Sequence, residues 1–143
     1  MRTIARRFAA TLAALMVAGA AFAQSSTLAG RLVGHWSLAS VAIGGQQPYG
    51  AAPQGSMFFD AAGHFSIIVA SGGNAGSIAY FGEYKVDEAT SVVNLHIDAG
   101  TRHSATGRDQ RRIAALNGDQ LTLTSDKSPH GLGTVTLIWQ RAD

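Results

Sequence analysis

From residue 35 to the end of the printed sequence, β-branched and aromatic residues cluster in short runs separated by glycine, asparagine and aspartate. No segment after residue 33 shows a sustained apolar period of about 3.6 residues, the pattern typical of an amphipathic helix. These features constrain the fold most, because they predict strands joined by turns and leave no helix long enough to cross over a sheet. Before the strands, residues 28–33 are expected to form a short helical turn. Eight strands are expected, at about 35–43, 55–60, 64–70, 78–87, 91–98, 107–116, 120–125 and 133–141.

Short polar breaks join several of these strands, and Asn117-Gly118 accepts the positive φ angles of a tight hairpin turn. Neighbouring strands are therefore expected to be antiparallel. An open sheet would expose two edges, whereas closure removes them. The sequence predicts an all-β domain, a closed eight-stranded antiparallel up-and-down β-barrel, with an immunoglobulin-type sandwich as the competing arrangement. If tight and long loops lie at opposite ends, the mouth is formed by the longer breaks at about 44–54, 71–77, 99–106 and 126–132.

The beginning of the chain has the pattern of an export signal. Three arginines precede an apolar run from Phe8 to Ala23, and the sequence then becomes polar. This order is typical of a secretory signal peptide, with cleavage near Ala23. The run is shorter than the roughly 20 residues of a spanning helix, so no stable membrane anchor is expected. We therefore expect a signal peptide at 1–23, a short lead at 24–30, a barrel domain at 31–143, and a periplasmic or secreted location.

Charge and cysteine content narrow the function classes. Three of the 11 lysines and arginines, and none of the nine acidic residues, lie in the first 23 residues. The remaining eight basic and nine acidic residues give a net charge of −1, so the overall value of +2 describes the precursor. Nucleic-acid binding needs a concentrated basic surface and is not expected. The chain has no cysteine, so its stability depends on an ordinary apolar core.

Gly34-His35-Trp36 heads the first expected strand, and Arg141 lies near the end of the last. The first motif is similar to the Gly-x-Trp signature of lipocalins, and Arg141 matches the arginine that covers the signature tryptophan. In such a barrel the first and last strands pair, so Trp36 and Arg141 are expected to meet at the closed end. A guanidinium over an indole face contributes roughly 0.5 to 2 kcal/mol.

Further motifs follow in order along the chain: Leu32–Leu38, Pro48–Gly50, Pro53–Gly55, Asp60–Gly63, Gly82–Asp87, Arg111–Arg112 and Gly118–Leu123. Together they resemble the bacterial and fungal lipocalin-like domain family over essentially residues 31–141. The resemblance implies a small barrel with a cavity and no uniform activity. Some lipocalin-like barrels bind lipids or pigments, and others shape a polyene substrate during cyclisation, so the fold alone does not choose between binding and catalysis.

Alternation along the strands sorts side chains into an inward and an outward set. In strand 78–87, Tyr80 and Tyr84 share the inward side, and their hydroxyls could orient a ligand in an apolar cavity. Gly82 lies between them and either relieves crowding or enlarges the cavity. The inward residues expected to contact a ligand are Phe65, Ile67, Tyr80, Tyr84, Leu95 and Leu137.

Arg108, Gln110 and Arg112 share one face of strand 107–116. If that face pointed inward, Arg112 could hold a carboxylate through two parallel hydrogen bonds, so Arg112 is also a candidate ligand-binding residue. An unpaired buried arginine is costly, and the solvated outer face is therefore the default expectation. A shift of one residue in the alternation would reverse this assignment.

Candidates for catalysis are few. His96 and Asp98 share one strand face but supply only two of the three or four ligands that zinc needs, so neither a metal site nor a cofactor is expected. No activated nucleophile stands out, and His96 or Tyr84 are the candidate proton donors. The leading hypothesis is an exported, non-enzymatic protein that binds a small hydrophobic or amphipathic molecule inside the barrel. The alternatives are an isomerase or cyclase that uses the same cavity, and a filled barrel that acts as an interaction module.

Overall fold

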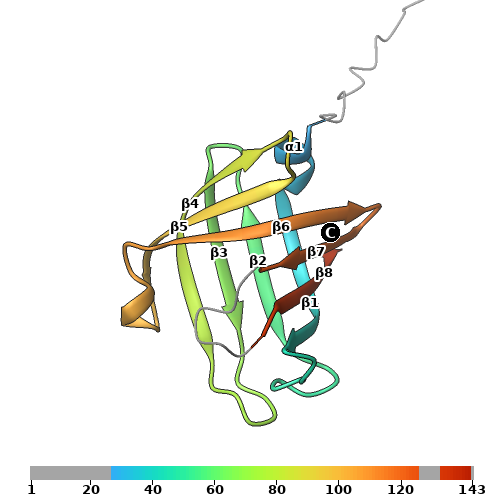
Figure 1. The fold of residues 1–143 in the computed structure, drawn as a ribbon, viewed down its shortest axis with the longest axis vertical. Helices are drawn as coiled ribbons and strands as arrows, with labels where there is room; N and C mark the ends of the chain where they lie inside the picture. Colours follow the sequence, from blue (N-terminus) through green and yellow to red (C-terminus); the bar gives the residue numbers. More distant parts are fainter. Residues whose placement is uncertain (1–26, 126–132, 143) are drawn as a thin grey trace, which may run out of the picture.

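The computed structural model describes residues 27–125 and 133–142, which form a β-barrel with a short helix at one end (Figure 1). All eight expected strands are present, and the expected helical turn is α1. The predicted signal peptide at 1–23 lies outside the described residues. In chain order the elements are α1 (Leu28–Leu32), β1 (Gly34–Ile43), β2 (Gly55–Phe59), β3 (His64–Val69), β4 (Ile78–Asp87), β5 (Val92–Gly100), the 3₁₀ turn η1 (His103–Ala105), β6 (Asp109–Asn117), β7 (Gln120–Thr124) and β8 (Val135–Ala142).

The sheet closes on itself. Each strand pairs antiparallel with the next along the chain, and β1 pairs with β8 from His35↔Ala142 to Ile43↔Val135. The predicted closed eight-stranded up-and-down barrel is thus confirmed, and the competing sandwich is wrong. Closure removes both edges of the sheet, whose main-chain groups would otherwise need other partners.

Strand bounds differ from the prediction by at most two residues, as at the start of β8 and on both sides of the connection between β5 and β6. The sequence predicts an end at 98 and a new start at 107, whereas β5 continues to Gly100 and β6 begins at Asp109. The 3₁₀ turn η1 and Gly107, whose φ is 72°, occupy the connection. Glycine adopts this positive φ readily because it has no Cβ atom. Residues of regular strands have negative φ, so β6 begins only after residue 107.

Burial follows the predicted alternation along the strands. In β3, for example, Phe65, Ile67 and Val69 are buried while His64 and Ile68 are exposed. The barrel core comprises inward residues of all eight strands, together with Leu32 of α1 and Tyr49 of the loop after β1. Its largest fully buried side chains are Trp36, Trp139, Leu32, Met57, Ile67, Leu95, Ile97, Leu121, Leu123 and Val93.

Trp36 and Arg141 meet at the α1 end of the barrel, as the sequence predicts. They are register partners on β1 and β8, and the Arg141 guanidinium carbon lies 4.2 Å from the Trp36 ring centroid. The Trp36 Nε1–H also donates to the Leu32 carbonyl over 2.8 Å. The tryptophan therefore links the core to the helix that covers this end.

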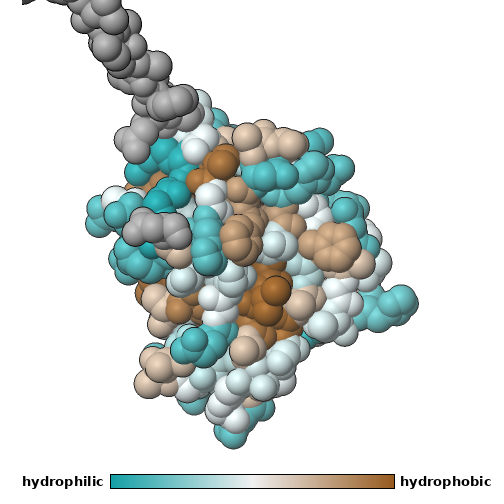
Figure 2. Space-filling view, turned by 180° about the vertical axis from the view of Figure 1, so that it is seen from behind, coloured by the Kyte–Doolittle hydropathy of each residue, from teal (hydrophilic) through white to brown (hydrophobic). Residues whose placement is uncertain are grey.

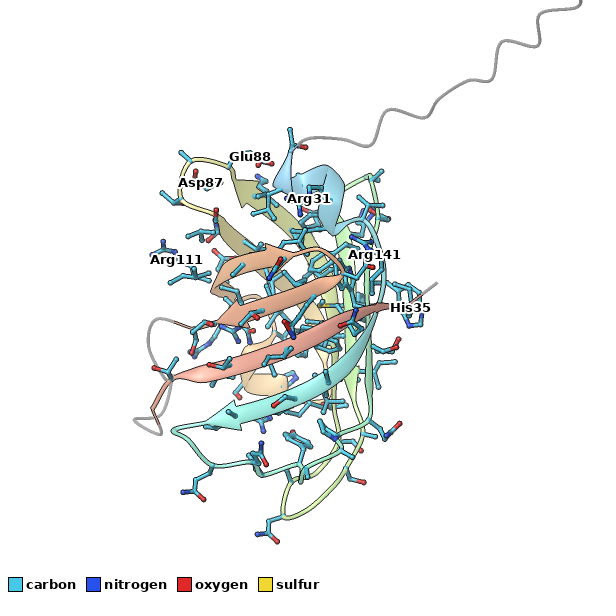
Figure 3. All side chains as sticks on the ribbon, turned by 90° about the vertical axis from the view of Figure 1, so that its right-hand side faces the viewer. Arg31, His35, Asp87, Glu88, Arg111 and Arg141 are labelled. Atoms are coloured by element: carbon cyan, nitrogen blue, oxygen red, sulfur yellow. The ribbon has the colours of Figure 1, made fainter. Side chains whose placement is uncertain are left out.

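The helix α1 is held at both of its ends. The Glu88 carboxylate accepts hydrogen bonds from the main-chain N–H groups of Leu28 and Ala29, at 2.8 and 2.9 Å. At the other end, the Arg141 guanidinium donates to the carbonyls of Arg31 and Val33. Figure 3 shows Glu88 and Arg141 beside the helix. These contacts satisfy main-chain groups that a five-residue helix cannot pair internally.

Gly82 lies at an irregularity in the β4–β5 pairing, where the register shifts between Phe81 and Gly82. A Cβ atom placed on Gly82 would overlap the His96 carbonyl oxygen and would lie 2.9 Å from the Asp98 nitrogen. Of the two roles the sequence suggests for this glycine, the structure supports relief of crowding. The crowding comes from the backbone of β5 and not from other core side chains.

The long loops gather at the end opposite α1 (Figure 1). In an up-and-down barrel the connections after β1, β3 and β5 must all lie at the same end. Residues 44–54, 70–77 and 101–108 form these three connections, whereas the turns after β2, β4 and β6 are short. The predicted mouth is therefore confirmed for these loops, and the fourth loop, at 126–132, falls outside the described residues.

The outer surface of β2, β3 and β4 carries exposed apolar side chains. Phe58, Ile68 and Phe81 are each about half exposed. Across the strands, Ser66 of β3 pairs with Phe58 of β2 on one side and with Phe81 of β4 on the other. The imidazole of His35 stacks on the Phe58 ring at 4.2 Å between ring centroids. Figure 2 shows apolar side chains in the middle of the molecular face opposite to that of Figure 1. We call Phe58, Ile68 and Phe81 the outer apolar patch.

Candidate ligand cavity

A cavity of about 460 Å³ opens at the loop end of the barrel. This volume is within the range of roughly 300 to 1,000 Å³ found for small-molecule sites. Five strands and three loop regions contribute to its walls. The lining residues are Val41, Ile43, Pro48, Tyr49, Ile67, Val69, Asn74, Ala75, Gly76, Ile78, Tyr80, Arg102, Ala105, Gln110, Arg112, Val135 and Leu137.

The cavity has two chemically different walls. Neighbouring strands β8 and β1, with β3 beyond β2, contribute only aliphatic side chains: Val135, Leu137, Val41, Ile43, Ile67 and Val69. In the rest of the wall, β4 and β6 and the loop before η1 contribute Ile78 together with the polar side chains of Tyr80, Gln110, Arg112 and Arg102. A molecule in this space would therefore meet hydrocarbon on one side and hydrogen-bond donors on the other.

Arg112 faces the cavity, so the expectation that it lies on the solvated outer face is wrong. Gln110 and Arg112 are register partners of Leu95 and Val93, which are buried in the core. Residues opposite each other in an antiparallel pair project to the same side of the sheet. Arg111 and Asp109 consequently point outward and are exposed.

The guanidinium of Arg112 has neutral hydrogen-bond partners. Its Nη2 donates to Gln110 Oε1 at 2.8 Å, and its Nη1 donates to the Arg111 carbonyl at 3.0 Å. Within the described ranges no carboxylate forms an ion pair with Arg112, and none lines the cavity. Arg102 adds a second cationic side chain at the rim. The cavity therefore carries positive charge without an acidic counterpart from the described chain.

Tyr80 adds a neutral donor to the same wall. Burial raises the pKa of Tyr80, although the charges of Arg112 and Arg102 oppose this effect. The phenol therefore stays protonated at neutral pH and can donate. Its ring packs edge to face against Phe65, with 5.9 Å between centroids, and no described residue forms a hydrogen bond with its hydroxyl.

Hydrogen bonds at and beside Tyr49 connect two loops at the mouth, residues 44–54 and 70–77. Its hydroxyl donates to the Gly76 carbonyl over 3.2 Å, and the Asn74 N–H donates to the carbonyl of Pro48 over 3.0 Å. Burial raises the pKa of Tyr49, while the nearby Arg102 lowers it. In the sequence, Pro48–Gly50 stands out only as a motif, and the strand pattern alone does not place Tyr49, Arg102 or Gln110 in the cavity.

Four predicted ligand-binding residues line the cavity: Ile67, Tyr80, Leu137 and Arg112. The other three, Phe65, Tyr84 and Leu95, are buried in the core and do not line it.

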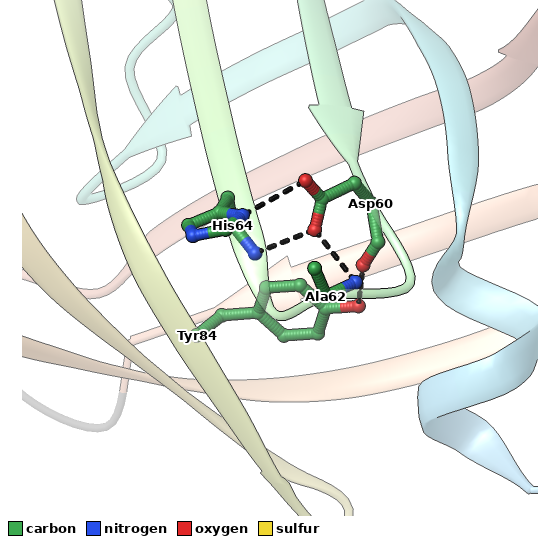
Figure 4. Close-up of polar contacts among 4 residues, drawn as sticks. All are labelled: Asp60, Ala62, His64 and Tyr84. Atoms are coloured by element: carbon green, nitrogen blue, oxygen red, sulfur yellow. Dashed lines mark hydrogen bonds and ion pairs between the residues drawn. The ribbon is translucent and has the colours of Figure 1, made fainter.

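Tyr84 lies near the closed end of the barrel. Its hydroxyl donates to the Asp60 carbonyl at 2.7 Å, which holds the turn between β2 and β3 (Figure 4). Burial raises the pKa of Tyr84, and the negative charge of Asp60 adds to this effect. The Tyr84 hydroxyl, which the sequence suggests as a proton donor, thus donates its hydrogen to a main-chain carbonyl and does not line the cavity.

Trp139 leaves one buried donor unsatisfied. It follows Leu137 by two positions on β8, toward the closed end, and is fully buried. Its Nε1–H has no hydrogen-bond acceptor among residues 27–125 and 133–142. Buried donors are normally paired, so this N–H is an exception among the described side chains.

His96, the other candidate proton donor, lies on the outer surface of the barrel. Its Nδ1 is 2.6 Å from Asp109 Oδ1, and its Nε2 is 4.0 Å from Asp98 Oδ1. It does not line the cavity, so the hypothesis that it transfers a proton there is wrong. The part of the chain that the structure describes contains no group of three or more His, Asp or Glu residues arranged to hold a metal ion.

Two surface histidines are expected to make the free energy of unfolding depend on pH. Hydrogen bonds to Asp109 and Asp60 raise the pKa of His96 and His64, respectively. Their contribution is fully present below the unfolded pKa of about 6.5 and is lost as pH rises through the folded values. We expect the thermal midpoint to fall between about pH 6 and pH 8, and to fall less in the His64→Gln/His96→Gln variant. Equal slopes in thermal melts of the two proteins would contradict this.

The Asp60 carboxylate is expected to contribute to stability with the opposite pH dependence, since its contribution is lost as pH falls. Hydrogen bonds from the His64 main chain and side chain lower the pKa of the carboxyl below its ordinary value of 3.8. Figure 4 shows these bonds together with the one from the Ala62 N–H. Their contribution is present above pH 3.8 and is lost as pH falls through the lowered pKa.

The fold and cavity define a class: a small, closed up-and-down β-barrel, consistent with a lipocalin-like fold, whose cavity opens among the loops at one end. No protein-family model matches the chain, and no curated protein matches it. Among the described residues, no helix combines the length and apolar character needed to cross a membrane.

Proposed function

We propose that this chain is an exported lipocalin-like protein that binds a small amphipathic molecule inside its barrel. The observation that carries the proposal is the cavity of about 460 Å³, with aliphatic side chains on one wall and hydrogen-bond donors on the other. An apolar cavity with a few convergent polar groups is typical of small-molecule sites. The exported location rests on residues 1–23, and finding the chain outside the cytoplasm with Gln24 as its first residue would test it.

The same observations argue against the two alternative functions. A filled barrel would have no cavity of this size at its loop end. The two side chains that the sequence suggests as proton donors do not reach the cavity, because His96 lies outside and the Tyr84 hydroxyl is bonded to the Asp60 carbonyl. We therefore favour binding over turnover.

Uncharged alcohols test whether the cavity binds a small amphipathic molecule, independently of any attraction between the ligand and the arginines. Linear alcohols from 1-octanol to 1-dodecanol would be titrated by displacement of a fluorescent apolar probe. Each buried methylene contributes about 0.8 kcal/mol, so affinity is expected to rise about fourfold per carbon until the cavity is full. Failure of the whole series to bind, or affinity independent of chain length, would contradict the proposal.

Two variants locate the binding. Leu137→Trp places a larger side chain in the aliphatic wall and is expected to weaken alcohol binding at least about tenfold, because it fills the space that a tail would occupy. Ile68→Ser removes an apolar side chain from the outer apolar patch and is expected to leave affinity unchanged. Circular dichroism would verify that both variants fold. The reverse pattern would assign binding to the patch.

A further inference from the structure

The charges of the barrel are distributed unequally between its inside and its outside. Every acidic side chain in the described residues is exposed, and none lines the cavity. Arg112 and Arg102 do line it, with Arg112 within the barrel wall and Arg102 in the rim loop before η1. Field lines from a cation concentrate in a cleft with low-dielectric walls. The interior therefore attracts anions although the rest of the surface carries acidic groups.

Arg112 retains unused hydrogen-bonding capacity. A guanidinium has five N–H donors in a planar fork, and the two bonds described above go to the Gln110 amide oxygen and the Arg111 carbonyl. Both acceptors are neutral, so neither balances the charge. The Gln110 side chain, on the same face of β6, instead fixes the guanidinium in position beside the cavity.

We infer that the cavity selects amphiphiles whose head is an oxyanion, with a carboxylate as the simplest case, and that Arg112 holds this head. The inference rests on the proposed function, because it names the chemical class of the molecule bound at the same site. A carboxylate accepts two parallel hydrogen bonds from a guanidinium, which gives both strength and orientation. Tyr80 supplies a further donor on the same wall, and Arg102 adds positive charge at the rim.

The opposite wall accommodates the rest of such a ligand. Val41, Ile67 and Leu137 belong to the β8, β1 and β3 side of the barrel and carry no polar side-chain atoms. A hydrocarbon tail against these residues removes apolar surface from water, while the head stays at β6. The arrangement therefore disfavours a cationic head, which would approach Arg112 with like charge and leave its donors unused.

Three ligands with the same tail separate charge from hydrophobicity: dodecanoate, 1-dodecanol and dodecyltrimethylammonium, each titrated below its micellar concentration at neutral pH. Wild-type protein is expected to bind dodecanoate at least about tenfold more tightly than dodecanol, with the cation weakest. Arg112→Gln should remove this preference while leaving the affinity for dodecanol within about twofold. Arg112→Lys keeps the charge and should retain part of the preference.

Arg111→Gln is the matched control, because it removes the same charge from the neighbouring position, whose side chain is exposed outside the barrel. It should leave the carboxylate preference intact. The inference is overturned if wild-type protein binds dodecanol as tightly as dodecanoate, or if Arg111→Gln and Arg112→Gln reduce dodecanoate binding equally. In either case the proposed binding function survives, whereas failure of all three ligands to bind would overturn both.

Discussion

Gly82→Ala is expected to destabilise the barrel by about 3 kcal/mol or more, which would make it one of the most damaging single-methyl additions in the chain. The new Cβ would overlap the His96 carbonyl oxygen. The obstacle is backbone, so no side-chain rotation relieves it, and β4 and β5 must separate where their register already shifts. Urea denaturation followed by tryptophan fluorescence would measure the loss.

Gly76→Ala is the matched control. A Cβ at Gly76 would have no heavy atom within 4 Å, and its backbone is not in the left-handed region. The substitution should change the free energy of unfolding by less than about 0.5 kcal/mol. Similar stability for the Gly82→Ala and Gly76→Ala proteins would show that β4 and β5 do not approach each other as closely as the structure indicates.

Trp36→Ala is expected to cost about 3 to 5 kcal/mol, the range for removing a large aromatic side chain from a core. Trp36 is fully buried, donates to the Leu32 carbonyl and lies under the Arg141 guanidinium. Its removal therefore leaves a cavity and releases the contacts that hold α1 over the closed end. Differential scanning calorimetry would report the loss as a lower thermal midpoint.

The pairing of Trp36 with Arg141 can be isolated by a double-mutant cycle. Trp36→Leu removes the aromatic face, and Arg141→Met removes the charge while keeping a long apolar stem. We expect a coupling energy of about 0.5 to 2 kcal/mol. Strictly additive effects would mean that Arg141 acts through its bonds to the Arg31 and Val33 carbonyls and its ion pair with Asp119, and not through the Trp36 ring.

The fold was largely predictable because strand periodicity and turn chemistry are local properties of a sequence. The inward parity of Phe65, Ile67 and Leu137 follows from alternation, and the structure confirms it. The contact between Trp36 and Arg141 followed from the family resemblance and is confirmed at 4.2 Å. In contrast, the end of β5 at Gly100 depends on a 3₁₀ turn that periodicity does not detect.

The site was less predictable, for two physical reasons. Alternation indicates whether a side chain points inward but not its depth along the barrel, so Phe65, Tyr84 and Leu95 were assigned to a cavity that begins nearer the mouth. The orientation of Arg112 depends on the register between β5 and β6, which pairs it with Val93. Both faces of this strand carry charged as well as apolar residues, so its sequence does not determine the register.

The most direct test of ligand binding inside the barrel is a crystal structure of the protein with dodecanoate. We expect density for one molecule within the barrel, with its carboxylate at hydrogen-bonding distance from the Arg112 guanidinium and its tail against Val41, Ile67 and Leu137. Density only on the outer apolar patch of Phe58, Ile68 and Phe81, with an unchanged cavity, would contradict it.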